Sequence, residues 1–109
     1  MAHYLIAQVK VNDDSWMPDY AEKVHDIVHR HNGKYLARSA NLTALEGELP
    51  DCHLVALLEF PSNGELQAFV ADPDYAPFAA ARQNGTDSTF FSIDSTDAAG
   101  TIPYLDAAG

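Results

Sequence analysis

The chain is poor in basic residues and in cysteine. Only 6 of its 109 residues are Lys or Arg, against 16 Asp or Glu, and the formal net charge is −10. A surface of that sign repels phosphate groups, so we expect neither nucleic acid nor an anionic membrane as a partner. The single cysteine, Cys52, cannot form an intramolecular disulfide, which fits a reducing compartment.

Long apolar runs are also missing. No run reaches the roughly 18–20 residues that would span a bilayer. The first residues alternate between apolar and polar like a strand, and they carry neither the basic start nor the cleavage site of a signal peptide. We therefore expect a cytoplasmic protein.

What the chain does have is enough apolar residues for one core. Hydrophobic residues make up 47% of the sequence, which is typical of a globular domain, and 109 residues leave room for one domain only. The regular patterns run through residues 1–94. The small, polar segment 95–109 is interpreted as a tail.

The hydrophobic periodicity predicts four strands and three helical segments. An amphipathic helix runs from Pro18 to the Asn32-Gly33 pair, a second one begins at Ser62 and Glu65 in the S-x-x-E capping pattern, and Asp74 caps a short third helix before Gly85. Period-two or continuous apolar patterns predict strands over 3–11, 34–40, 54–60 and 88–94. The order is βαββαβ, the pattern of an α+β, ferredoxin-like fold with a four-stranded antiparallel sheet.

Such a fold packs its helices on one face of the sheet and leaves the other face open. If Leu5, Ala7 and Val9 face the helices, the open face is predicted to hold Tyr4, Ile6, Gln8, Lys10, Leu36, Arg38, Val55, Leu57, Glu59, Phe90 and Ser92. Monomers rarely expose so large an apolar patch, and a second copy of the chain would cover it. We therefore expect a homodimer that closes into a dimeric α+β barrel, with a small-molecule pocket in its lumen.

Five short segments resemble one known family. They are Gly33-Lys34-Tyr35-Leu36-Ala37-Arg38, Leu45-Glu46-Gly47, Leu58-Glu59-Phe60-Pro61-Ser62, Asp72-Pro73-Asp74-Tyr75 and Arg82. In order and spacing they are similar to the domain-of-unknown-function family numbered 1330, in the dimeric α+β barrel superfamily. The chain departs from the family at Ser39-Ala40, where glycines are usual, and in its longer tail.

The resemblance implies a ferredoxin-like subunit and a homodimer with its sheets face to face. It implies no established activity. The wider superfamily contains cofactor-free monooxygenases, muconolactone isomerases, haem-degrading enzymes and amino-acid-sensing domains, and a shared fold does not choose among them.

Arg38 and Glu59 are the candidate catalytic residues. On neighbouring strands they could pair, with the guanidinium holding a carboxylate or enolate and Glu59 orienting it or acting as a base. A structural ion pair at the dimer seam is the alternative. Candidate ligand-binding residues are Gln8, Tyr20, Arg38, Tyr75 and Arg82, although both tyrosines also suit simple core packing.

Metal and cofactor sites have little support in the sequence. His25 and His29 share a helix face with His31 nearby, but the H-E-x-x-H pattern is absent, and we expect no metal. No dinucleotide or phosphate-binding glycine loop is present, so we expect no cofactor that depends on one.

Two functions remain open. The first is a homodimer that binds a small organic acid or aromatic metabolite in its lumen and acts on it without a cofactor. The second is a non-catalytic dimeric module for sensing or assembly, its lumen filled by its own side chains.

Overall fold

The computed structural model describes residues 1–99, and part of the expected tail, residues 100–109, lies outside them. The elements follow the predicted order: β1 His3–Val11, α1 Met17–Arg30, β2 Lys34–Ser39, β3 Leu54–Phe60, α2 Asn63–Val70, α3 Ala76–Gly85 and β4 Thr86–Asp94. The four strands form one antiparallel sheet in the order β2-β3-β1-β4. The ferredoxin-like α+β fold is therefore confirmed.

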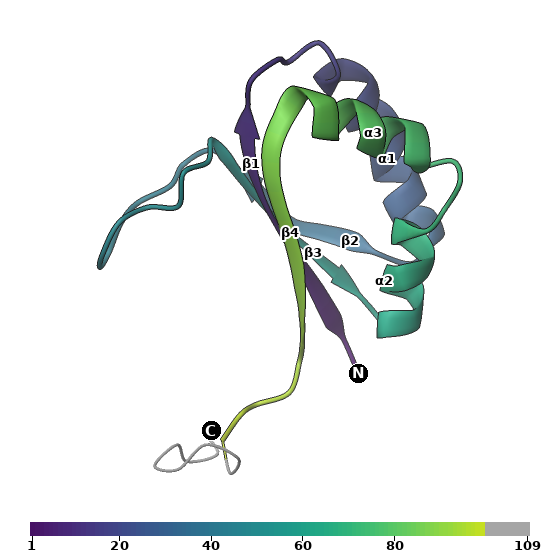
Figure 1. The fold of residues 1–109 in the computed structure, drawn as a ribbon. Helices are drawn as coiled ribbons and strands as arrows, with labels where there is room; N and C mark the ends of the chain where they lie inside the picture. The colour runs from purple at the N-terminus through teal and green to yellow at the C-terminus, as the bar shows by residue number, and fades with distance from the viewer. Residues whose placement is uncertain (100–109) are drawn as a thin grey trace.

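The sheet has one covered and one open face. All three helices lie on the same side of the sheet, and the 40–53 segment between β2 and β3 extends away on the other side (Figure 1). Among residues 1–99, no helix combines the length and the apolar character that crossing a bilayer requires.

The hydrophobic core fills the space between the sheet and the helices. β1 and β3 alternate, so every second side chain is buried from Leu5 to Val9 and from Ala56 to Phe60. The buried apolar residues are Leu5, Ala7, Val9, Val24, Ile27, Val28, Ala56, Leu58, Phe60, Leu66, Phe69 and Tyr75.

The ends of α1 and α2 follow the predicted chemistry. Asn32 has a positive φ of 62°, and the Gly33 N–H donates to the Val28 carbonyl at 3.0 Å, which closes α1 in a Schellman turn. At α2, the Ser62 hydroxyl accepts from the Glu65 N–H at 3.3 Å. The reciprocal half of the capping box is not made, because the buried Glu65 Oε2 has no partner.

The prediction for the start of α3 is wrong. Asp74 does not cap this helix, whose first flanking residue is Tyr75 with no side-chain cap. Asp72 holds the turn instead: its carboxylate accepts from the Asp74 N–H at 2.8 Å, and its carbonyl accepts from the Tyr75 and Ala76 N–H groups. The Asp72 side chain reaches the Asp74 N–H two residues on, as in an Asx-turn, while its backbone carbonyl takes the two amides that follow.

The predicted open face is wrong in two places. A β-bulge between Tyr35 and Ala37 shifts β2 by one residue, so Arg38 pairs with the buried Ala56 and turns toward the helices. Because side chains alternate along a strand, one extra residue moves all later side chains to the other face.

The second error concerns β4. Phe90 pairs with Ala7 and Ser92 with Leu5, so both lie on the helix side, while Phe91 and Ile93 occupy the open face. Phe90 and Phe91 are adjacent, and hydrophobicity alone does not decide which of the two turns inward.

Candidate functional site

A cavity of about 210 Å³ lies between the sheet and the helices. Its wall is mostly apolar, and Leu5, Ala7, Val9, Leu54, Ala56 and Leu58 form its floor on the sheet. Met17, Ala21, Phe69 and Phe90 close it from the helices and from β4. Packed protein cores contain few voids of this size, so the cavity is a candidate binding site.

The polar groups that reach the cavity are aromatic or cationic. They are Trp16, Tyr20, Tyr35, Arg38, Tyr75 and Arg82. Among the described residues that line it, none is an Asp or a Glu. In a chain of net charge −10, the cavity is therefore locally positive.

Two tyrosines share a hydrogen bond in the wall. The Tyr20 and Tyr75 hydroxyl oxygens are 3.0 Å apart, and the Tyr75 ring stacks on Phe69 at a centroid distance of 4.5 Å. Burial, and then the neighbouring Tyr75, raises the pKa of Tyr20 above its ordinary value. Tyr20 is thus a neutral phenol that can donate or accept a hydrogen bond, but not a phenolate base.

Arg38 lies at the rim, exposed to solvent on one side. Its guanidinium carbon sits 4.0 Å from the centre of the Tyr35 ring, and its Nη2 donates to His25 Nδ1 at 3.1 Å. Arginine only donates, so His25 Nδ1 must be the accepting, unprotonated nitrogen. The His25 ring therefore holds Arg38 at the rim.

Arg82 lies deeper, and its residue is only 6% exposed. Its guanidinium carbon is 3.9 Å from the centre of the Phe90 ring, and its Nε has no acceptor. Within residues 1–99, no carboxylate forms an ion pair with it.

The predicted pairing of Arg38 with Glu59 is wrong, because the two lie on opposite faces of the sheet. Glu59 pairs across the sheet with Tyr4 and Lys34, and its carboxylate lies 3.8 Å from Lys34 Nζ. Two features separate them: the bulge in β2 turns Arg38 toward the helices, and the register places Glu59 opposite Lys34 and Arg38 opposite Ala56.

Of the predicted ligand-binding residues, four come together at the cavity: Tyr20, Arg38, Tyr75 and Arg82. Gln8 does not, because it pairs with Val55 and Thr89 on the open face. A role for Gln8 or Glu59 in a lumen between two subunits stays a prediction.

Two wall residues, Trp16 and Tyr35, escaped the sequence analysis. Trp16 lies directly before α1, and its Nε1 is buried without an acceptor. It packs so closely on Gly85 that a Cβ there would come within 2.7 Å of Nε1. The only tryptophan of the chain, placed just ahead of an amphipathic helix, was the available clue.

His25 and His29 contact each other. Their rings meet edge-on at 4.3 Å, and His25 also stacks on Tyr35. In the part of the chain that the structure describes, no three His, Cys, Asp or Glu residues group as a metal site would need.

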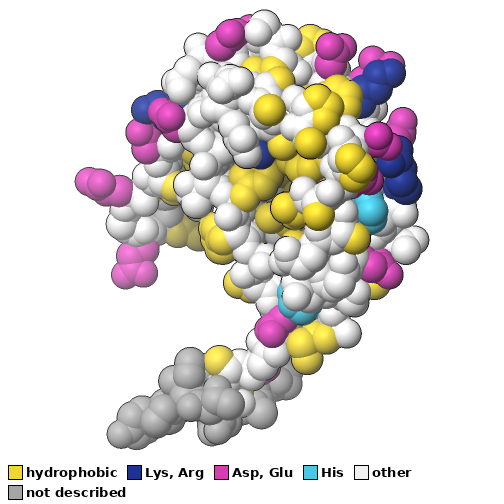
Figure 2. Space-filling view, turned by 45° about the vertical axis from the view of Figure 1, so that its right-hand side comes forward, with side chains coloured by type: hydrophobic (Ala, Val, Ile, Leu, Met, Phe, Trp, Pro, Cys, Tyr) yellow, Lys and Arg dark blue, Asp and Glu magenta, His cyan; other side chains and the backbone are white. Residues whose placement is uncertain are grey.

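An open groove of about 780 Å³ adjoins the cavity along β4. Leu5, Phe69, Tyr75, Arg82 and Phe90 line both spaces, so Arg82 stands where the two meet. Figure 2 shows this side of the molecule hollowed, with apolar side chains in the recess and basic atoms among them.

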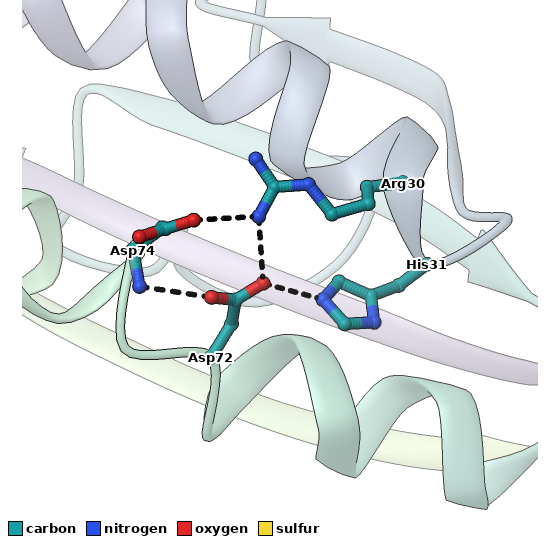
Figure 3. A network of polar contacts seen from close by, with 4 residues as sticks. All are labelled: Arg30, His31, Asp72 and Asp74. Atoms are coloured by element: carbon teal, nitrogen blue, oxygen red, sulfur yellow. Dashed lines mark hydrogen bonds and ion pairs between the residues drawn. The ribbon is translucent and has the colours of Figure 1, made fainter.

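A polar network lies outside the cavity, between the end of α1 and the turn before α3 (Figure 3). The Asp72 carboxylate accepts from His31 Nε2 at 2.7 Å and from Arg30 Nη1 at 3.3 Å, and Arg30 also reaches Asp74 at 2.8 Å. The His31 hydrogen bond, then the Asp74 N–H, then Arg30, lower the pKa of Asp72. The network ties the end of α1 to the turn that carries Tyr75.

Sequence comparison then decides the family. The family described as "Domain of unknown function (DUF1330)" matches residues 2–96. The chain belongs to this family. The DUF1330 match spans every strand and helix described above. No curated protein matches the sequence.

Solved structures share the fold of this DUF1330 chain. A protein of unknown function from Rhodopseudomonas palustris, RPA0582, is 18% identical over 88% of this chain and 83% of its own, with a TM-score of 0.70. SnoaB, a cofactor-independent oxygenase from Streptomyces nogalater, is 13% identical over 88% and 94%, with a TM-score of 0.62. A dimeric ferredoxin-like protein of unknown function from Thermobifida fusca is 18% identical over 86% and 91%, with a TM-score of 0.53. At these identities the likeness is one of fold.

The Asp72 network makes a prediction for stability. Asp72→Asn should lower the melting temperature at pH 7 by several degrees, because it weakens the bonds to His31 and Arg30. Since the folded-state pKa of Asp72 is lowered, its contribution is complete above the ordinary Asp pKa of about 3.9 and is lost as the pH falls through the folded-state value. Thermal melts of both proteins at pH 7 and pH 3 measure the difference, which should shrink at pH 3.

Asp74→Asn is the matched control. The Asp74 side chain is 68% exposed and, within residues 1–99, forms an ion pair only with Arg30, so its loss should change the melting temperature little. Equal effects of the two substitutions at pH 7 would contradict a special role for Asp72.

Proposed function

We propose that the chain is a homodimer that binds a small organic acid or aromatic metabolite in the cavity between its sheet and its helices, and acts on it without a cofactor. The observation that carries this proposal is an apolar cavity whose charged wall groups are two arginines, Arg38 and Arg82. Apolar walls with a few convergent polar groups are typical of ligand sites.

The wall groups suit stabilisation of negative charge. Arg38 at the rim and Arg82 inside are cations, and the neutral Tyr20–Tyr75 pair can donate a hydrogen bond. In a site with little water, such donors stabilise an enolate or oxyanion as it develops. The fold shared with SnoaB, described as a cofactor-independent oxygenase, supports chemistry of this kind.

The second candidate is a non-catalytic module for sensing or assembly. One observation favours it: among the described residues no carboxylate lines the cavity, and burial raises the pKa of Tyr20 and of Tyr35 in its wall, so neither phenol is a base. Binding alone needs no proton acceptor, whereas most acid–base catalysis does.

The dimer is proposed from the open face of the sheet. Phe91 and Ile93 on this face are 43% and 51% exposed, next to Ile6 and Leu57. Leu45, on the segment that extends from the same side, is 95% exposed (Figure 1). A second copy would bury these apolar groups, and the Thermobifida fusca protein of the same fold is described as dimeric.

Native mass spectrometry of protein purified from its natural host tests the proposal as a whole. We expect a dimer that retains a small molecule of a few hundred daltons or less, because the cavity is small. An empty dimer from cells would favour the non-catalytic module, and a monomer would contradict the homodimer.

A charge on the open face should separate the subunits. Leu57→Glu places a carboxylate where the partner's sheet would lie, and burying it unpaired is costly. Size-exclusion chromatography with light scattering should give a dimer for the unmodified chain and a monomer for Leu57→Glu. Val70→Glu, on the helix side where Val70 is 51% exposed, is the control and should stay dimeric. A dimeric Leu57→Glu protein, or a monomeric unmodified chain, would contradict this interface.

Filling the cavity should abolish binding without unfolding the protein. Ala56 is buried in the cavity floor, and Ala56→Leu adds three carbons to that space. We expect a stability within about 1 kcal/mol of the unmodified protein, or above it, because the side chain occupies an existing void. The retained mass in native mass spectrometry should disappear.

Ala68→Leu is the control for this substitution. Ala68 is exposed on α2, on the helix side of the sheet, and lines neither the cavity nor the groove. It should keep the bound mass; a ligand that persists in Ala56→Leu would place the site elsewhere.

A further inference from the structure

Arg82 is the one buried cation of the described chain that lacks an acidic partner. Its residue is 6% exposed, its Nε is buried without an acceptor, and no carboxylate of residues 1–99 pairs with it. A guanidinium stays protonated in proteins, so the charge cannot be removed by titration. A buried, unpaired charge is expensive, and proteins retain one chiefly where a ligand supplies the counter-charge.

Nearby protein groups do not neutralise Arg82. The Phe90 ring below it at 3.9 Å offers only its π face. Tyr20 is the neighbouring group with an acidic proton, and Arg82 acts to lower the Tyr20 pKa. Burial of Tyr20 outweighs that effect and keeps the phenol neutral. Asp51 and Asp87 also line the groove along β4, but among residues 1–99 no carboxylate lies within ion-pair distance of Arg82, so its positive charge has no direct partner in the subunit.

We propose that Arg82 binds the carboxylate group of the ligand. The ligand is a compact monocarboxylic acid whose apolar ring enters the cavity. This inference rests on the proposed function and names the substrate class of the same site. Arg82 lines both the cavity and the polar groove along β4, so an acid approaching from the groove meets the guanidinium before its ring is buried. A planar guanidinium binds a carboxylate with two parallel hydrogen bonds.

The size of the cavity and its wall groups narrow the class of ligand. A cavity of about 210 Å³ lies below the range of pockets that hold drug-sized ligands, so it suits a single-ring acid. The hydroxyls of Tyr20 and Tyr75 stand in the same wall and can hold a second polar group of the ligand. The net charge of −10 repels anions at a distance, but a contact inside the cavity is screened far less than that field.

Acids and their amides give the direct test. Benzoate against benzamide, and cyclohexanecarboxylate against its amide, differ in charge at nearly the same shape. Titrations by NMR or calorimetry should show that the unmodified dimer binds each acid roughly tenfold or more tightly than its amide, since only the acid pairs with the guanidinium.

Arg82→Met and Lys34→Met each remove one positive charge. Lys34 lies at the open face, where it pairs loosely with Glu59, so Lys34→Met should keep the preference for acids. Arg82→Met should lose that preference and keep its affinity for the amides. Without ligand it should melt at the temperature of the unmodified protein or a few degrees above it, because an unpaired buried charge has been removed.

Each result has one meaning. If the unmodified protein binds acids and amides with equal affinity, Arg82 does not bind the ligand's carboxylate, while the cavity still stands as the binding site. If neither the acids nor the amides bind, both the proposed function and the role of Arg82 are overturned. An Arg82→Met protein that is strongly destabilised or does not fold would assign Arg82 a structural role and overturn the inference.

Discussion

A single extra residue in an edge strand decides the chemistry of the cavity. Without the bulge between Tyr35 and Ala37, Arg38 would point away from the helices and lie on the open face of the sheet, the face that also carries Glu59. With the bulge, Arg38 stacks on Tyr35 at the rim of the cavity. Bulges often re-aim a side chain in this way next to a functional site. The result is a separation of charge, with the carboxylate on one face of the sheet and the cation on the other.

The rest of the molecule maintains that separation. The chain carries 16 acidic residues, yet none of those within residues 1–99 lines the cavity, and Asp72, which is largely buried, is held by His31 and Arg30 outside it. The same Asp72 orders the turn before α3, which carries Tyr75 at its start and Arg82 further along. One acidic side chain thus positions two of the cavity's polar groups while adding no negative charge to the cavity.

Much of the fold follows from sequence patterns, and the failures have physical causes. Strict alternation in β1 and the apolar run of β3 fix the centre of the sheet, and Asn32-Gly33 fixes the end of α1. A bulge leaves no trace in the hydrophobic pattern, so the sequence could not predict on which face of the sheet Arg38 lies. The adjacent Phe90 and Phe91 satisfy either register of β4. Tyr20, Tyr75 and Arg82 were identified individually, but only the packing of α1 against α3 brings them together.

The central claim is that ligands enter the space between the sheet and the helices, not the space between two sheets. Methyl and indole NMR spectra during a benzoate titration test it most directly. The account predicts shifts at the Trp16 indole and at the Ala7 and Ala56 methyls, which line the cavity, with little change at Ile6 and Leu57. Shifts confined to Ile6 and Leu57 on the open face would contradict it.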